Sequence, residues 1–558
     1  MIKRNLVSSL FLALSLSTTV HSALDRIIDF ALLDEVGVFH QLSRYQHKDA
    51  VVLMAFDQSC QLMPSMLAEY HDIVNEFSNH GIEFLLIDSK GSGREKLASL
   101  ESSVSILEDS GQLVSESLGI KNAGEVLLLN PERLSIYFRG PPSQDLRTSL
   151  NSLESIQDTL ELESRGCEIE YPDKVAHEFN TPDYATEVAP IIIENCVACH
   201  NQGGVGPFAF DSYVMVLGWS PMIREVLLNK RMPPMQVDPY IGYSDNARYL
   251  QTEQLQTLVH WIDAGAPRGL STTDPLESFE LMDDDRWVLG EPDFIVSAKS
   301  NDVPPTGVLD YIYDRVDLPF EEDKWLRAVE YKAGDPAVLH HLATFVTAPD
   351  EDFWGQERHE LYPKRRFVES YSPGKVNSKI FEKGTGVFIP KGSSLSMQFH
   401  YVTNGQRTTD SSKLGLYFSE DQDLHERLVQ VVSSRFVLPP NEPNFALHAD
   451  FVFESRVVLT GVRAKMNYRG KRMKFSIEEA NGVITDIFSI PAYNYGWQPH
   501  YNFDEPLVLE AGTKVHVRGA LDNSISNPTN PDPEKEVTFG LNSWDEMFTG
   551  YFTISEKP

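Results

Sequence analysis

Two cysteines and a histidine at positions 196–200, in the order Cys-Val-Ala-Cys-His, constrain this chain more than any other feature of its sequence. The spacing is typical of c-type haem attachment, in which each thiol adds to a vinyl group and the histidine binds the iron. We therefore expect Cys196 and Cys199 to hold haem c covalently, with His200 as an axial ligand. The alternative is a redox CxxC pair that happens to precede a histidine.

The N-terminus has the pattern of an export signal. Lys3 and Arg4 precede a largely apolar run over 6–20, and small residues surround Ser22. This order predicts a signal peptide over 1–22, cut after Ser22. An uncleaved anchor is the alternative, although the run is short for a membrane span. We expect a periplasmic or secreted protein with no membrane span after cleavage, which agrees with haem attachment outside the cytoplasm.

Length and charge limit the classes of protein. A chain of 558 residues is long enough for several domains, each with its own core. The net charge of −33 argues against nucleic acids and anionic membranes as partners. The sequence therefore predicts a multidomain protein with an acidic, solvated surface.

Residues 25–165 are predicted to form an α/β domain. Apolar runs at 51–56 and 82–87 are typical of buried strands, and 63–80 between them has helical spacing. Residues 126–138 predict a late hairpin. This order resembles the thioredoxin-like or redoxin fold.

The resemblance places Cys60 at the redox position of that fold. Met63 stands where a second thiol would be, and 123–125 lacks the proline of the family. A structural or partner-docking domain is therefore favoured over a peroxidatic thiol, which would need a lowered pKa. A disulfide between Cys60 and Cys167 is another alternative, because an oxidising compartment allows it to form.

Residues 180–270 predict a helical domain around the CxxCH segment. Its order of helix, loop and late helix resembles the all-α class I cytochrome c family, which implies exchange with a periplasmic electron donor or acceptor. A soft thioether should supply the second axial ligand, and the proline-rich loop 231–235 offers Met232, with Met235 as the runner-up. A methionine that only fills a core gap is the alternative. The predicted helices are 184–195, 213–229 and 253–264.

The remaining sequence alternates short β-rich runs with turns, which predicts two antiparallel β-sandwiches over 285–420 and 425–558. The expected strands include 325–331, 341–346, 395–401, 457–462, 515–518 and 551–554.

The motifs around His340, His341, His400 and Met547 resemble those of the copper type II, ascorbate-dependent monooxygenases, namely peptidylglycine α-hydroxylating and dopamine β-monooxygenase. The family has two eight-stranded jelly rolls with one copper each. The resemblance implies that His340, His341 and His400 bind the electron-transfer copper, and three imidazoles suit that metal. It implies that Met547 belongs to a second, oxygen-activating copper. Ordinary packing is the alternative for the histidines.

The second site departs from the family, because Lys465 and Asn467 stand where two histidines are expected. An ammonium group repels a cation, and an amide oxygen is a poor copper ligand. His448, His500 and His516 are further candidate metal ligands, but their spacing in the sequence does not itself indicate a site.

Two hypotheses about the function follow. In one, haem passes electrons to a copper that hydroxylates a small-molecule or peptide substrate; in the other, the protein is a non-catalytic electron-transfer, copper-binding or assembly protein.

Overall fold

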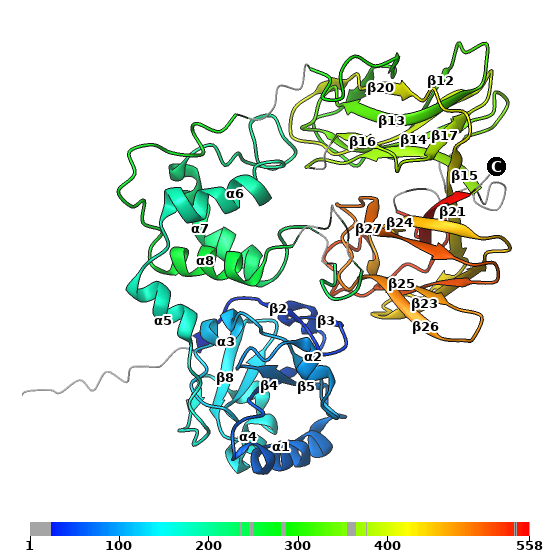
Figure 1. Cartoon of the computed structure of the whole chain (residues 1–558). Helices are drawn as coiled ribbons and strands as arrows, with labels where there is room; N and C mark the ends of the chain where they lie inside the picture. Colours follow the sequence, from blue (N-terminus) through cyan, green and yellow to red (C-terminus); the bar gives the residue numbers. More distant parts are fainter. Residues whose placement is uncertain are drawn as a thin grey trace, which may run out of the picture.

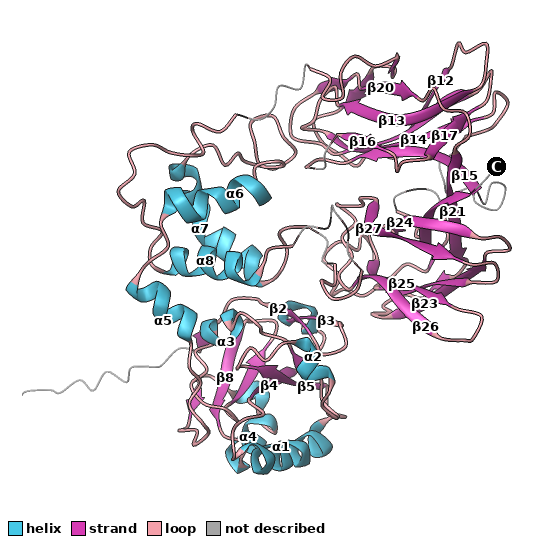
Figure 2. Ribbon diagram, viewed as in Figure 1, coloured by secondary structure: helices cyan, strands magenta, loops and turns pink. Residues whose placement is uncertain are grey.

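A computed structural model of the chain describes residues 24–234, 237–242, 244, 247, 249–280, 286–353, 364–374, 377–540, 542 and 544–556. A mixed α/β part, a helical part and two strand-rich parts follow one another along the chain (Figures 1 and 2). Each part has a hydrophobic cluster of its own, so the protein is multidomain. The predicted signal peptide lies outside the described residues, and no described helix has the length and apolar character that a membrane crossing requires.

The first domain is built on a mixed sheet with strand order β1-β8-β7-β4-β5-β6. Strand β4 (Ala50–Phe56) pairs parallel with β5 (Ile82–Asp88) and antiparallel with β7 (Val126–Asn130), which forms a hairpin with β8 (Ser135–Gly140). Helix α1 (Met63–Phe77) connects β4 to β5. This arrangement is thioredoxin-like, as the sequence predicted. The other strands and α-helices are β1 (Asp25–Arg26), β2 (Ala31–Leu33), β3 (Phe39–Gln41), α2 (Arg94–Ala98), β6 (Ile106–Leu107), α3 (Leu113–Ser117), α4 (Gln144–Leu150) and β9 (Leu160–Glu161), and two 3-10 helices span Leu42–Tyr45 and Leu153–Ser155.

The core of this domain follows from its apolar strands and extends past residue 165. Every residue of β4 is buried, because a central strand is covered on both faces of the sheet. Ile169 is buried in the same cluster and Tyr171 packs against it. The segment after the predicted limit is therefore part of this core.

In the described residues between 172 and 263, the regular elements are helices. Trp261 and Tyr184 form the centre of their cluster, with ring centroids 5.9 Å apart. The Trp261 indole N–H donates to the Pro267 carbonyl at 2.9 Å, which satisfies its only donor. The helices are α5 (Pro172–Phe179), a π-helical turn (Tyr184–Val188), α6 (Ala189–Asn195), α7 (Tyr213–Leu228) and α8 (Thr252–Asp263).

The first strand-rich part encloses one hydrophobic cluster between two sets of strands. One set pairs β10 (Phe294–Ser297), β20 (Lys413–Phe418), β13 (Lys324–Lys332), β16 (Ser378–Ile380) and β17 (Thr385–Ile389). The other pairs β12 (Ile312–Asp317), β18 (Ser394–Tyr401), β14 (Leu339–Thr347) and β15 (Lys364–Tyr371), and a short pair joins β11 (Asn301–Val303) to β19 (Thr408–Asp410).

The second strand-rich part repeats this plan around its own cluster. One set pairs β21 (His425–Ser434), β30 (Phe548–Glu556), β24 (Val457–Lys465) and β27 (Tyr501–Leu509). The other has the order β23-β28-β25-β26, with β23 (Phe445–Val452), β28 (Lys514–Leu521), β25 (Gly470–Glu478) and β26 (Ile484–Ile490). A short pair joins β22 (Val437–Leu438) to β29 (Val537–Thr538).

The two strand-rich parts are packed against each other. Strand β21 pairs with β15, and a separate apolar cluster that includes Phe345, Phe367, Val431 and Tyr551 lies between them. Side chains from the second part can therefore contact a site that is built on the first.

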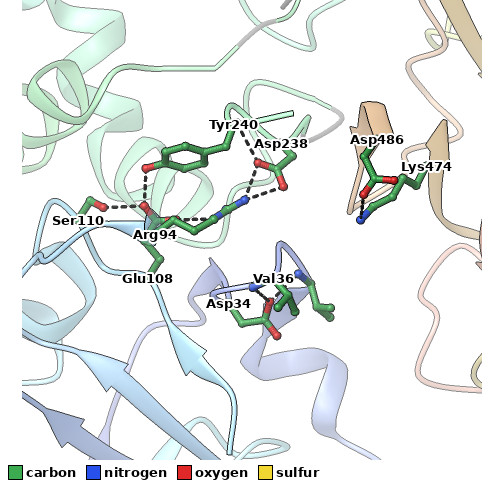
Figure 3. Close-up of polar contacts among 10 residues, drawn as sticks. Asp34, Val36, Arg94, Glu108, Ser110, Asp238, Tyr240, Lys474 and Asp486 are labelled. Atoms are coloured by element: carbon green, nitrogen blue, oxygen red, sulfur yellow. Dashed lines mark hydrogen bonds and ion pairs between the residues drawn. The ribbon is translucent and has the colours of Figure 1, made fainter. Parts of the chain in front are cut away.

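A buried ion pair ties the first domain to the loop after α7 (Figure 3). Arg94 of α2 donates from Nη1 to both carboxylate oxygens of Asp238 at 2.6 Å, and its Nε contacts Glu108 at 3.1 Å. The Arg94 guanidinium lies 4.4 Å from the ring centroid of Tyr240. The Asp238 N–H also donates to the Ser489 carbonyl at 3.0 Å, so this loop contacts the second strand-rich part as well.

Candidate functional site

The CxxCH segment begins where α6 ends. The Cys196 N–H donates to the Ile192 carbonyl at 2.9 Å, and the His200 N–H donates to the Cys196 carbonyl at 3.0 Å. These bonds continue a helical turn through the segment. Cys196 and Cys199 are both half-buried, so a large group could reach both sulfurs from the surface.

The His200 ring is oriented by a backbone carbonyl and by aromatic side chains. Its Nδ1 lies 3.1 Å from the Phe208 carbonyl oxygen, which fixes the proton on Nδ1 and leaves Nε2 as the ligand atom. The rings of Phe208 and Phe210 lie 4.8 and 5.1 Å from the imidazole, and Trp219 stacks on Phe208. Burial lowers the pKa of His200, which favours the neutral ring that binds metal.

Glycine is required beside this imidazole. A Cβ at Gly206 would lie 2.7 Å from His200 Nδ1, closer than real contacts allow. The close approach of this loop therefore helps to set the direction of the ring.

The predicted second axial ligand is less enclosed. Met232 lies in the turn after α7, where its N–H donates to the Val226 carbonyl at 3.2 Å, and its side chain is 39% exposed. It is not a member of the aromatic and aliphatic cluster around His200. The runner-up, Met235, lies outside the described residues. Ligation by Met232 stays a prediction.

Three histidines converge at one edge of the first strand-rich part. His340 and His341 lie at the start of β14, and His400 lies near the end of β18. The antiparallel register makes His341 and His400 direct partners, after a bulge between Leu339 and His341. A bulge lets consecutive side chains face one side. The ligand atoms of the three histidines lie within 4.8 Å of one another.

The Nδ1 atoms point to a common centre. His340 Nδ1 lies 3.2 Å from His341 Nδ1 and 3.2 Å from His400 Nδ1. Two nitrogens that are each about 2.0–2.1 Å from one metal ion lie roughly 3–3.5 Å apart. This spacing therefore fits a single ion between the three rings.

Residues of the second strand-rich part orient these rings from outside. His340 Nε2 contacts the Gly496 carbonyl, which fixes the proton on Nε2 and leaves Nδ1 as an acceptor. His400 Nε2 lies 3.2 Å from the Tyr495 hydroxyl. The Tyr311 ring also packs against the cluster, with its centroid 5.2 Å from that of the His400 ring.

The three imidazoles are held neutral. His340, His341 and His400 are 9%, 7% and 4% exposed. Burial, the largest cause, lowers the pKa of His340 to about 4 and lowers those of His341 and His400 well below the usual value. The charge of Lys465 lowers the pKa of all three. Metal binding requires unprotonated imidazole, so the cluster is prepared for it.

The residues of the predicted second copper site are brought together. In the pairing of β24 with β30, Lys465 lies opposite Thr549. Beyond it, the Asn467 N–H donates to the carboxylate of Glu546, the neighbour of Met547. Lys465, Asn467 and Met547 are all buried, so the positions that the resemblance matched are neighbours in space.

Their chemistry does not suit copper. Lys465 Nζ donates to the Tyr311 hydroxyl and lies 4.6 Å from the centroid of that ring. The Asn467 amide nitrogen donates to two carbonyls at 3.2 Å. Among the described residues its Oδ1 has no hydrogen-bond partner. One cation, one weak oxygen ligand and one thioether are a poor donor set for copper.

The two thiols of the first domain are joined. Cys60 and Cys167 form a disulfide with their Cα atoms 5.7 Å apart. The Ala123 N–H donates to the Cys167 carbonyl at 2.8 Å, which holds the returning chain beside the loop that precedes β7. Cys60 is buried, so in this state it offers no nucleophile.

Sequence reasoning did not identify the residues that surround the histidines, namely Tyr311, Tyr495 and Gly496. Each lies far from its imidazole partner in sequence; Gly496 is 156 residues from His340. Nothing in their local sequence signals the contact. Two other candidates, His448 and His516, lie together in a separate group with Asp450.

No protein-family model matches this chain, and no curated protein matches its sequence. Solved structures match about a quarter of it. A hypothetical protein from Sinorhizobium meliloti is 18% identical, over 27% of this chain and 94% of its own, with a TM-score of 0.24. A peroxidoxin from Mycobacterium tuberculosis is 17% identical over 25% of this chain and 99% of its own (TM-score 0.21), and a mitochondrial 2-Cys peroxiredoxin from Plasmodium falciparum is 15% identical over 24% and 93% (TM-score 0.19). At these TM-scores the likeness says nothing about activity, and the class of the first domain rests on its own strand order.

Proposed function

We propose that this protein is an extracytoplasmic electron-transfer protein that carries haem c on Cys196 and Cys199 and one copper ion on His340, His341 and His400. The convergence of three Nδ1 atoms around one centre carries the proposal. Copper would supply one-electron redox chemistry there, and haem c would supply it at the CxxCH segment. The chain's own residues orient the imidazoles, keep them neutral and exclude water.

The haem part of the proposal rests on the surroundings of His200. The Phe208 carbonyl leaves Nε2 as the ligand atom, and aromatic rings provide an apolar wall. In this proposal, residues 180–270 are a cytochrome c-like domain, and the two strand-rich parts are the jelly rolls of a copper type II scaffold. The disulfide between Cys60 and Cys167 agrees with an oxidising compartment and a structural first domain.

Electron transfer is favoured over substrate hydroxylation by the residues at the second position. Lys465 hydrogen-bonds to Tyr311, and the Asn467 amide is held by backbone carbonyls. We therefore assign no oxygen-activating copper to Lys465, Asn467 and Met547. The partners are then a periplasmic electron donor and an acceptor.

Copper stoichiometry on purified, haem-loaded protein tests this function. We expect one tightly bound copper that His341→Ala or His400→Ala removes, whereas the matched control His80→Ala, at an exposed position, leaves it in place. A copper stoichiometry that neither cluster variant lowers by one equivalent would overturn the assignment. A further equivalent that Met547→Leu removes would restore the hydroxylation hypothesis.

The haem ligand has its own test. Met232→Ala should abolish the sulfur-to-iron absorption band of the oxidised protein. If the band persists in this variant, Met232 is not the ligand, and Met235→Ala is the next variant to measure.

A further inference from the structure

The outward face of the second strand-rich part carries a second group of potential metal ligands. On β23, His448 and Asp450 are both exposed, and Ala449 between them is buried, as expected for alternation along a strand. On β28, His516 is the direct partner of Asp450. All three side chains therefore belong to one face of the sheet.

The ligand atoms of this group are close enough to share an ion. His448 Nε2 lies 3.1 Å from His516 Nδ1, and these two nitrogens and a carboxylate oxygen of Asp450 lie within 4.8 Å of one another. As at the three-histidine cluster, a nitrogen spacing of roughly 3–3.5 Å fits two ligands of a single metal ion.

A carboxylate behind His516 fixes which nitrogen is presented. His516 Nε2 lies 2.8 Å from Oε2 of Glu478, on the next strand, β25. This contact holds the proton on Nε2 and leaves Nδ1 as the acceptor that faces His448. A metal-binding histidine almost always has such a partner on its other nitrogen, which orients the ring and raises its basicity.

We propose that His448, Asp450 and His516 form a separate site for a divalent transition-metal ion, with Glu478 as the residue that positions His516. Two imidazoles and one carboxylate suit Zn²⁺ or Cu²⁺ rather than Mg²⁺ or Ca²⁺, which prefer oxygen ligands. Three protein ligands leave a coordination position for water or for an exogenous ligand. The site needs neither haem nor the three-histidine cluster, so it stands independently of the electron-transfer proposal.

Two basic groups on the same face compete with the metal. Lys514 Nζ lies 2.8 Å from Oδ2 of Asp450, and Arg518 is the direct partner of His448. The Lys514–Asp450 pair is partly exposed, and exposed pairs contribute little. A metal ion that takes Asp450 therefore replaces a weak contact, and Lys514→Met should tighten binding.

Zn²⁺ titration of the full-length, haem-loaded protein by calorimetry tests the site. We expect His448→Ala to remove one equivalent of Zn²⁺, while the matched control His80→Ala keeps it. Glu478→Gln should keep the stoichiometry and weaken the affinity about 10–100-fold. His448 is exposed, so its substitution should leave folding intact, which circular dichroism checks.

Two results would overturn the site. One is Zn²⁺ binding with the same stoichiometry and affinity in His448→Ala as in the unaltered protein. The other is a Cu²⁺ resonance spectrum that is the same in His448→Ala as in the unaltered protein. An unchanged affinity in Glu478→Gln would instead overturn the positioning role of Glu478 alone. The same titration with Cu²⁺, followed by the nitrogen hyperfine pattern of its paramagnetic resonance spectrum, should show two imidazole nitrogens at this site and three at the cluster of His340, His341 and His400.

Discussion

If the three-histidine cluster binds copper as proposed, replacing Lys465 with methionine should lower the reduction potential of that copper. Lys465 is 4% exposed, and its charge already lowers the pKa of all three imidazoles. A nearby positive charge disfavours Cu²⁺ more than Cu⁺, because the repulsion grows with the charge of the ion. Methionine has a similar length and no charge, so Lys465→Met removes the repulsion and keeps most of the packing.

The size of the shift follows from the distances. Lys465 Nζ lies 4.6 Å from the Tyr311 ring centroid, which lies 5.2 Å from the His400 ring centroid. The charge is therefore at most about 10 Å from the His400 ring. At an effective dielectric constant near 20, two unit charges at about 10 Å interact by about 1–2 kcal/mol. For a one-electron couple this is a fall of roughly 40–90 mV.

Potentiometric titration of the Cu²⁺ resonance signal measures this shift. Lys474→Met is the matched control, because Lys474 pairs with Asp486 on the surface of the same strand-rich part (Figure 3) and its removal should leave the potential unchanged. An unchanged or raised potential in Lys465→Met would refute the electrostatic argument. Equal shifts in both variants would assign the effect to net charge rather than to position.

Three further predictions concern stability. Asp238→Asn should remove one of the two carboxylates that pair with Arg94, leave Glu108 in place and cost about 1.5–3 kcal/mol, seen as faster proteolysis of the loop after α7. Double replacement of Cys60 and Cys167 by serine should lower the unfolding free energy of the first domain by about 2–5 kcal/mol in urea titrations. Burial raises the pKa of Asp109 to about 6, so stability should fall as pH rises from about 4 to 6, by up to about 3 kcal/mol, and Asp109→Asn should flatten this slope.

Each of these has a contrary outcome. Unchanged proteolysis in Asp238→Asn would show that the ion pair does not hold the loop. A double serine variant as stable as the unaltered protein would mean that the disulfide does not constrain the unfolded chain. For Asp109, the folded carboxyl binds its proton more tightly than the unfolded one, so a rise in stability over the same pH range would contradict the pKa direction.

Local sequence patterns predicted the secondary structure well where a strand or helix carries its own signal. The expected strands at 51–56 and 395–401 are β4 and β18, and the helix expected from 213 is α7. Continuous apolar runs and helical spacing are local properties, so they can be recognised in a sequence without knowledge of the fold. The grouping of His340, His341 and His400 was predicted only from the resemblance to the copper monooxygenases, and their ligand atoms lie within 4.8 Å of one another.

What the sequence could not predict depends on how distant segments dock. The contact of Gly496 with His340 arises because the second strand-rich part packs on the first. The joining of Cys60 to Cys167 depends on a return of the chain over a sequence separation of 107. The prolines of the loop predicted a stiff backbone around Met232. A stiff backbone does not determine where the side chain points, and the Met232 side chain is 39% exposed.

The position of Lys465 also bears on the direction of electron flow. A buried ammonium is costly unless polar groups compensate it, and here the Tyr311 hydroxyl and ring do so. The compensation is partial, because the Lys465 charge still lowers the pKa of the imidazoles that would hold copper. With copper bound as proposed, a cation at this place would raise the copper potential and favour Cu⁺, so the cluster would act as an electron acceptor. If the cluster binds copper as proposed, these charges favour electron flow toward it.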